Sequence, residues 1–295
     1  MTYSSQDPVG LKASIIIPVR NAERTISSAL SAVLEQALLQ PVEVIIVDNS
    51  STDHSVGMIR ALALESPSLK IVDASERLGA AYARNVGAKH ASADLLIFLD
   101  SDDVIEPGWL NAYLAAAGPE CLLTGPIDTL KLATYPPWGA AASRLRPSMT
   151  FRGQPFAISA NCAVSRSLFE RVGGFQSDLG GTVGEDVEFS WHVESLGFPL
   201  QFVPGAIVLK RPRVTRREMF AQWSNYAMSS ANLHHRYPER TRWTIGSARW
   251  TPTRQESVQE MMQCLAHPVR HQGVFIQLAG LIVGRIRQAL LSVRH

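Results

Sequence analysis

Four short runs rich in β-branched and aliphatic residues alternate with helical patterns near the start of the chain, and this alternation restricts the fold most. The runs are residues 14–18, 42–47, 70–73 and 94–99. Between the first two, Ile26, Leu30 and Val33 recur at helical spacing. The alternation predicts an α/β fold whose parallel sheet has helices on both faces. In such sheets ligands bind beyond the carboxyl ends of the strands.

Composition agrees with a globular protein that has a real core. The 295 residues are 46% hydrophobic and 18% charged, which excludes a disordered or fibrous chain. The three cysteines show neither a disulfide framework nor paired metal-ligand spacing, and this favours a reducing compartment. The sequence shows no secretory signal pattern and no apolar run of the roughly 20 residues that span a bilayer. We expect a cytoplasmic protein, soluble or attached peripherally to the inner face of the cell membrane.

Charge is divided unevenly along the chain. Residues 1–200 hold 14 basic and 22 acidic side chains, whereas residues 201–295 hold 14 basic and 4 acidic ones. An acidic body with a basic C-terminal region is suited to an anionic partner such as a phosphate group or a membrane surface. No zinc-finger or aromatic RNA-binding motif accompanies the basic region, so we expect no nucleic-acid partner.

Polar side chains follow three of the expected strands. These residues are Arg20, Asn21 and Glu23 after the first, 48–50 after the second, and 100–103 after the fourth. Because ligands bind at this edge of a parallel sheet, these positions predict a binding site. The glycine-rich dinucleotide fingerprint is missing after the first strand, which argues against a nicotinamide-dependent dehydrogenase.

Three carboxylates crowd together after the fourth strand. Asp100, Asp102 and Asp103 repel one another unless a cation or hydrogen-bond donors offset their charge. Their oxygens suit Mg²⁺ or Mn²⁺ bridging to a substrate diphosphate. The alternative is that they cap a helix that begins near Pro107.

The order and spacing of these motifs resemble the family 2 glycosyltransferases. The segments that carry the resemblance are residues 14–23, 44–53, 83–87, 97–103, 173–175 and 184–186. It is close over residues 12 to about 110 and resumes with the last two segments. The resemblance implies a GT-A fold, a Rossmann-like nucleotide-sugar-binding sheet flanked by helices. The helical patterns further along the chain add a C-terminal helical extension to this expected fold. The resemblance also implies inverting transfer of a sugar from a nucleotide donor to an acceptor hydroxyl.

The resemblance assigns roles to individual residues. The implied donor-binding residues are Pro18, Val19, Arg20, Glu23, Asp48, Arg84, Asp100 and Ser101. Asp100 and Asp102 match the family's Asp-x-Asp motif, whose second carboxylate reaches the metal. Asp186 matches the catalytic base, and Glu185 is an acceptor contact or a structural neighbour. Both acids open an expected helix, whose positive end favours ionised carboxylates.

One position departs from the family pattern. Many relatives carry a histidine that completes the metal shell after the last strand, and the nearest residue here is Lys210. A protonated lysine does not coordinate a metal but binds a diphosphate as a point charge. We therefore count Lys210 among the donor-binding residues and treat the Mn²⁺ or Mg²⁺ requirement as open.

The acceptor side carries weaker signals. We expect strands at residues 121–125, 156–161 and 201–203, and an irregular segment at 134–153 that serves as a lid or binding loop. Asn161 and Gly181 are candidate acceptor contacts, although glycine there also serves simply to turn the chain.

The C-terminal region combines basic clusters with helical patterns. A helix is expected around residues 219–226, and its basic face is either solvated or phosphate-binding. An apolar stretch at 274–283 is too short to span a bilayer; it lies in a membrane interface or packs as a core or dimerisation helix. We expect a donor-binding half at 11–105, an acceptor-binding and catalytic half at 106–210, and a basic helical extension at 211–295.

Together these patterns predict a hexosyltransferase-type enzyme of polysaccharide or glycan biosynthesis. We expect a UDP-sugar as donor and a glycan, lipid-linked or small-molecule acceptor. Two alternatives remain: a nucleotidyltransferase of similar architecture, and a catalytically silent subunit that binds sugar nucleotides.

Overall fold

The computed structural model describes residues 10–132, 149–151, 154–177, 184–211 and 215–241. The described residues up to Arg211, apart from Gly184, belong to one compact unit. The two helices after it, α7 (Arg216–Arg236) and α8 (Pro238–Thr241), belong to a second.

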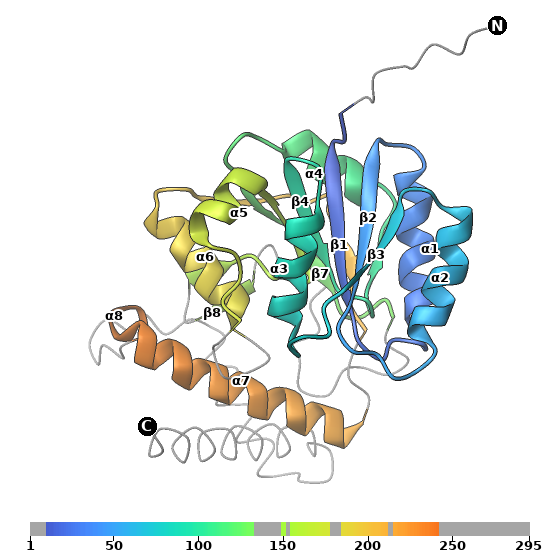
Figure 1. The fold of residues 1–295 in the computed structure, drawn as a ribbon. Helices are drawn as coiled ribbons and strands as arrows, with labels where there is room; N and C mark the ends of the chain where they lie inside the picture. The colour runs from blue at the N-terminus through green and yellow to red at the C-terminus, as the bar shows by residue number, and fades with distance from the viewer. Residues whose placement is uncertain (1–9, 133–148, 152–153, 178–183, 212–214, 242–295) are drawn as a thin grey trace, which may run out of the picture. The chain divides into compact units, whose positions relative to one another are not determined.

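A seven-stranded sheet with the order β11-β6-β10-β4-β1-β2-β3 forms the centre of the first unit (Figure 1). Its strands are β1 (Ala13–Val19), β2 (Val42–Asp48), β3 (Leu69–Asp73), β4 (Leu95–Leu99), β6 (Leu122–Thr124), β10 (Asn161–Ser165) and β11 (Leu200–Phe202). The pairs β1–β2, β2–β3, β1–β4 and β6–β11 are parallel, whereas β10 runs antiparallel to β4 and β6. The four strands expected near the start of the chain are confirmed.

Helices cover both faces of this sheet, as predicted. On one face lie α1 (Ile26–Ala37), α2 (Ser55–Glu65) and α4 (Trp109–Ala116); on the other lie α3 (Ala80–His90), α5 (Arg166–Val172) and α6 (Glu185–Ser195). Alternate strand residues serve the two cores: Ile15 and Ile17 pack with the first set, and Ile16 with the second. Successive strand residues point to opposite faces, and both faces are buried under helices, so successive positions in these strands are apolar.

Two small sheets complete the described fold. The first contains β5 (Val104–Ile105), β12 (Val208–Leu209) and β7 (Ile127–Asp128), and the second contains β8 (Met149–Phe151) and β9 (Gln154–Phe156). β12 pairs with β5 in antiparallel register, with Leu209 opposite Val104. The residue after β12 therefore lies beside the residue before β5.

The acceptor-side segments differ in part from the sequence-based prediction. The strand predicted at 156–161 is wrong, because β9 ends at Phe156 and β10 begins at Asn161. Between them the backbone leaves strand pairing: the Ala157 N–H donates to Ser190 Oγ at 2.9 Å, and the Asn161 N–H donates to the Ile158 carbonyl at 2.9 Å. Most of the expected irregular segment at 134–153 lies outside the described residues, but its residues 149–151 form β8.

The expected halves at 11–105 and 106–210 share one sheet, because β10 pairs with β4. Their separation, and that of an extension at 211–295, stays a prediction. The expected helix around 219–226 is confirmed as part of α7, which begins with a capping box between Thr215 and Glu218. The apolar stretch at 274–283 lies outside the described residues. Within the part of the chain that the structure describes, no helix has both the length and the apolar character needed to cross a membrane.

Candidate active site

The carboxyl ends of β1, β2 and β4 meet at one edge of the sheet and bring the expected donor-side residues together. Val19 lies opposite Asp48 in the β1–β2 pair, and Asp100 directly follows β4. Hydrogen bonds join the loops after β1 and β2: the Glu23 N–H donates to Asp53 Oδ2 at 3.1 Å, and the His54 N–H donates to Glu23 Oε2 at 3.2 Å. Glu23 is thus held beside the β2 loop.

The residues at the end of β1 differ in what they can offer a ligand. Arg20 is exposed and Pro18 is partly exposed. The Val19 side chain is 1% exposed and packs in the core, and its carbonyl accepts a hydrogen bond from the Asn49 N–H at 2.8 Å. Val19 therefore contributes a core side chain and a main-chain hydrogen bond to this turn, and its side chain presents no surface to a nucleotide.

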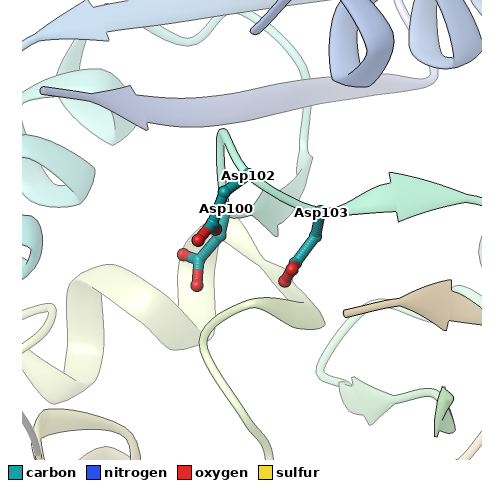
Figure 2. A group of neighbouring side chains, drawn as sticks. All are labelled: Asp100, Asp102 and Asp103. Atoms are coloured by element: carbon teal, nitrogen blue, oxygen red, sulfur yellow. The ribbon is translucent and has the colours of Figure 1, made fainter. Parts of the chain in front are cut away.

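Asp100, Asp102 and Asp103 form a compact acidic cluster in the turn between β4 and β5 (Figure 2). One oxygen atom from each lies within 4.8 Å of the others. Asp103 is fully buried, whereas Asp100, Ser101 and Asp102 are partly exposed. The alternative role of this acidic group as a helix cap is wrong, because β5 follows directly and α4 begins only at Trp109.

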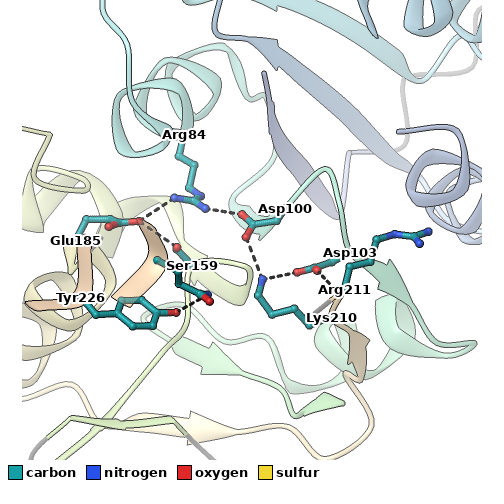
Figure 3. A network of polar contacts seen from close by, with 9 residues as sticks. Arg84, Asp100, Asp103, Ser159, Glu185, Lys210, Arg211 and Tyr226 are labelled. Atoms are coloured by element: carbon teal, nitrogen blue, oxygen red, sulfur yellow. Dashed lines mark hydrogen bonds and ion pairs between the residues drawn. The ribbon is translucent and has the colours of Figure 1, made fainter. Parts of the chain in front are cut away.

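Arg84 joins this cluster to the start of α6 (Figure 3). One guanidinium nitrogen donates to Asp100 Oδ1 at 2.6 Å, and another donates to Glu185 Oε1 at 3.0 Å. The Arg84 side chain is 3% exposed, which leaves little surface for the nucleotide contact expected from the sequence. The guanidinium instead connects a donor-side acid and an acceptor-side acid that lie 85 residues apart in the sequence.

Lys210 enters the cluster from the opposite side (Figure 3). Its Nζ lies 2.8 Å from Asp103 Oδ2 and 3.3 Å from Asp100 Oδ2. The Arg211 N–H donates to the second oxygen of Asp103 at 3.3 Å. The cluster is therefore partly neutralised by the protein itself.

Burial and charge act in opposite directions on these groups. Burial opposes ionisation of Asp100, but Lys210 and Arg84 outweigh it and lower the Asp100 pKa to about 2. For Asp103 burial dominates and raises the pKa to about 7, although Lys210 opposes this shift. Burial disfavours the charged form of Lys210, but Asp103 and Asp100 outweigh it and raise the Lys210 pKa.

The donor set fits a hard divalent cation. Carboxylate oxygens are the ligands that Mg²⁺ and Mn²⁺ prefer, and three of them converge here. Together with Glu185, the network contains four carboxyl groups against the two cationic side chains of Arg84 and Lys210. Acidic groups are in excess, so the three aspartates could hold a metal ion.

Glu185 and Asp186 begin α6, directly after Gly184, whose φ of 101° suits a residue without a side chain. Glu185 accepts hydrogen bonds from Arg84 and, at 3.3 Å, from Ser159 Oγ. Asp186 is 9% exposed, and one of its oxygens accepts from the Val187 N–H at 2.9 Å. Burial, reinforced by the neighbouring Glu185, raises the Asp186 pKa to about 7. The helix start does not lower the pKa of this carboxyl as expected, because the effect of burial is larger.

Asn161 occupies a different place from the acceptor surface for which it was a candidate. It is fully buried, and its amide oxygen accepts from Trp109 Nε1 at 2.9 Å and from the Tyr113 hydroxyl at 2.8 Å. Its amide nitrogen donates to the Pro126 and Ala206 carbonyls at 3.1 and 2.8 Å. These four bonds favour a structural role over an acceptor contact. The other candidate, Gly181, lies outside the described residues.

Asn85 and Phe175 have places in the site that the motifs did not reveal. Asn85 donates to the Phe175 carbonyl at 2.7 Å and accepts from the Phe175 N–H at 2.9 Å. The Phe175 ring lies 5.9 Å from the Arg84 guanidinium carbon and 4.8 Å from the ring of Phe189 on α6. The two residues thereby link α3 to the helix that carries Asp186. Their motifs were visible in the sequence, but the pairing between them depends on contacts ninety residues apart.

Comparisons with known proteins identify the family of this chain. The profile of glycosyl transferase family 2 matches residues 14–173, and that of glycosyl transferase family group 2 matches residues 95–292. The glycosyltransferase AglE of Haloferax volcanii is 30% identical over 206 residues, which cover 66% of this chain and 65% of the relative. The pre-mycofactocin glycosyltransferase of Mycobacterium tuberculosis is 27% identical over 243 residues, which cover 77% of this chain and 48% of the relative. The chain thus spans between about half and two thirds of these relatives.

Solved structures share the fold. The mannosyltransferase PcManGT of Pyrobaculum calidifontis, in complex with GDP-Man and Mn²⁺, superposes with a TM-score of 0.63 at 20% identity, covering 96% of this chain and 88% of that one. Residues 1–349 of TarS from S. aureus, in complex with UDP-GlcNAc, give a TM-score of 0.55 at 16% identity, covering 95% of this chain and 92% of that one. These likenesses establish the GT-A fold. With the family profile matching more than half of its residues, the chain belongs to the family 2 glycosyltransferases.

Proposed function

We propose that this chain is an inverting glycosyltransferase that transfers a sugar from a nucleoside diphosphate donor to an acceptor hydroxyl. One observation carries the proposal: Arg84 joins Asp100, in the acidic cluster beyond the parallel strands, to Glu185, the neighbour of a buried carboxyl group. A donor diphosphate and a proton acceptor are the two groups that such a transfer needs within one site.

The donor side is suited to a leaving diphosphate. We assign nucleotide contacts to Arg20, Glu23 and Asp48 at the ends of β1 and β2, with Pro18 and Ser101 beside them. Asp102 and Asp100 would hold Mn²⁺ or Mg²⁺ here, and the ion would supply Lewis-acid stabilisation of the charge on the departing diphosphate. The ammonium of Lys210 adds a second positive charge at the same place.

Asp186 is the proposed general base. The acceptor oxygen attacks the anomeric carbon of the donor sugar, and the proton of the acceptor hydroxyl passes to the Asp186 carboxylate. The bond between the anomeric carbon and the diphosphate oxygen breaks at the same time. A pKa of about 7 suits this task, because a base near the working pH is both available and strong enough. Glu185, held by Arg84 and Ser159, fixes the start of the helix that carries the base.

The donor nucleotide and the acceptor are inferred from the ligands and the names of similar proteins. The neighbouring structures contain GDP-Man in one case and UDP-GlcNAc in another. An Escherichia coli relative, 38% identical over 31% of this chain and 35% of its own length, is named a UDP-Glc:alpha-D-GlcNAc-diphosphoundecaprenol beta-1,3-glucosyltransferase. We propose a UDP-sugar donor and a glycan, lipid-linked or small acceptor, used on the cytoplasmic side of the membrane.

The test combines nucleotide binding with turnover. Calorimetric titration with UDP and GDP, each with Mn²⁺ and with chelator, should show binding of one nucleotide. Asp186→Asn should keep that affinity and lose roughly 10²- to 10⁴-fold in transfer or in donor hydrolysis, the range expected for a lost general base. Asp94→Asn, an exposed acid just before β4, is the control and should leave both unchanged.

Each contrary result excludes a different part of the proposal. Full turnover by Asp186→Asn refutes its role as base. Release of pyrophosphate from a nucleoside triphosphate would favour a nucleotidyltransferase. Nucleotide binding without any turnover across acceptors would favour a silent binding subunit, and failure of every nucleotide to bind would refute the donor site.

A further inference from the structure

Strand pairing, rather than side-chain reach alone, brings Lys210 into the acidic cluster. β5 begins directly after Asp103, and β12 ends directly before Lys210. The antiparallel register of these strands sets the two residues side by side, and the Lys210 N–H is also held by the Asp128 carbonyl at 2.8 Å. The backbone of Lys210 is therefore fixed at the cluster.

The oxygens of two aspartates in the cluster are already engaged. Asp100 uses one oxygen for Arg84 and the other for Lys210. Asp103 uses one oxygen for Lys210 and the other for the Arg211 N–H. A divalent cation drawn to the same oxygens meets the positive charge of the ammonium at close range, and this repulsion weakens its binding.

The two cationic side chains differ in their freedom to respond to a ligand. The Arg84 side chain is 3% exposed, and both of its terminal nitrogens are paired with carboxylates. The Lys210 side chain is 22% exposed. A lysine ammonium carries three donors on a flexible stem, so it can exchange one oxygen partner for another. Diphosphate oxygens arriving at the exposed side of the cluster are such partners.

We propose that Lys210 is the resident cation of this site. Its ammonium neutralises Asp100 and Asp103 while no donor is bound, opposes the binding of free divalent metal, and turns to the diphosphate oxygens when the nucleotide enters. This inference rests on the proposed function, since it takes a nucleoside diphosphate as the ligand. Its consequence is that metal binds well only together with nucleotide, and that nucleotide keeps part of its affinity without metal.

The test measures Mn²⁺ binding directly, from the electron paramagnetic resonance signal of the free ion, without turnover. The wild-type protein should take up little Mn²⁺ alone and clearly more when UDP or GDP is added. Lys210→Met should bind Mn²⁺ alone at least about tenfold more tightly, the scale seen when groups around a metal site are changed. In chelator, the same variant should bind the nucleotide about tenfold more weakly, because a charge-assisted hydrogen bond is lost.

A matched control separates the cluster from a general effect of losing a lysine. Lys70 also pairs with a buried carboxylate, that of Glu43, at 2.6 Å and in the same unit. Lys70→Met should leave both affinities unchanged, and Lys210→Arg, which keeps the charge, should resemble the wild type in Mn²⁺ binding. If Lys210→Met does not fold, Lys210→Gln, which removes the positive charge but leaves a polar group beside Asp100 and Asp103, should also bind Mn²⁺ alone more tightly than the wild type.

The outcomes distinguish this inference from the function on which it rests. One outcome overturns the role of Lys210 and leaves the proposed function standing. In it the wild type binds a nucleotide, but Lys210→Met has the same affinity as the wild type for Mn²⁺ alone and for the nucleotide in chelator. Failure of the wild type to bind any nucleotide, with or without Mn²⁺, overturns both.

Discussion

Replacing Asn161 with alanine should destabilise the protein strongly and leave recognition of the acceptor intact. The side chain is fully buried between α4 and the segment before β12, and it makes four hydrogen bonds there. The prediction decides between the acceptor contact expected from the sequence and the structural role that the contacts favour.

The magnitude follows from which partners retain another hydrogen bond. The Tyr113 hydroxyl would still donate a hydrogen bond to the main-chain carbonyl of residue 161, which lies at 2.9 Å. The Pro126 carbonyl would still accept one from the Val208 N–H at 3.1 Å. Trp109 Nε1 and the Ala206 carbonyl lose the partner recorded for them in the described structure. A buried polar group left unsatisfied costs about 1–3 kcal/mol, so the two together should lower the free energy of unfolding by about 2–6 kcal/mol.

The assay is urea unfolding followed by far-ultraviolet circular dichroism and tryptophan fluorescence, with the acceptor KM measured in parallel. Asn111→Ala is the control, because this asparagine is exposed and accepts one hydrogen bond from Gln40. Its change in stability should stay within about 0.5 kcal/mol. A loss below about 1 kcal/mol for Asn161→Ala, accompanied by a raised acceptor KM, would refute the structural argument.

Two further predictions concern pH. Because Asp186 must be ionised to accept a proton and its pKa is raised to about 7, kcat/KM should rise about tenfold per pH unit below that pKa and level off above it; a flat profile across neutral pH would contradict its role as base. The Glu43 carboxylate accepts hydrogen bonds from Lys70, Ser14 and the Ser92 N–H. Burial opposes ionisation of Glu43, but the effect of these partners is larger and lowers the Glu43 pKa. The ionised form therefore stabilises the fold above the ordinary pKa of 4.5, and this stabilisation is lost as the pH falls through the lowered value. Glu43→Gln should accordingly be less stable than the wild type in urea at neutral pH, with a gap that narrows in acid; a gap independent of pH would exclude this ion pair as its cause.

The features predictable from the sequence are those encoded by local patterns. The apolar runs of β1, β2 and β4 identified a sheet buried on both faces, and the polar residues after them marked its carboxyl edge. The acids Asp100 and Asp102 were found in the same way, because they directly follow a strand.

The features that escaped prediction depend on contacts between distant residues. Nothing near Arg84 in the sequence shows that its guanidinium reaches Glu185, and nothing near Asn161 shows that four buried partners surround its amide. The short strands β5 and β12 have only two residues each, too few for a period to be recognised, although their register places Lys210.

The bridge made by Arg84 limits how this protein can be recombined with its relatives. Any junction between Asp100 and Glu185 separates the two carboxylates that share one guanidinium. A hybrid that takes its acceptor side from a relative with a neutral residue at the position of Glu185 would leave Arg84 with Asp100 as its one remaining carboxylate partner among the described residues. Exchange of acceptor specificity by segment swapping therefore requires the incoming segment to supply a carboxylate at that position, or Arg84 to be exchanged with it.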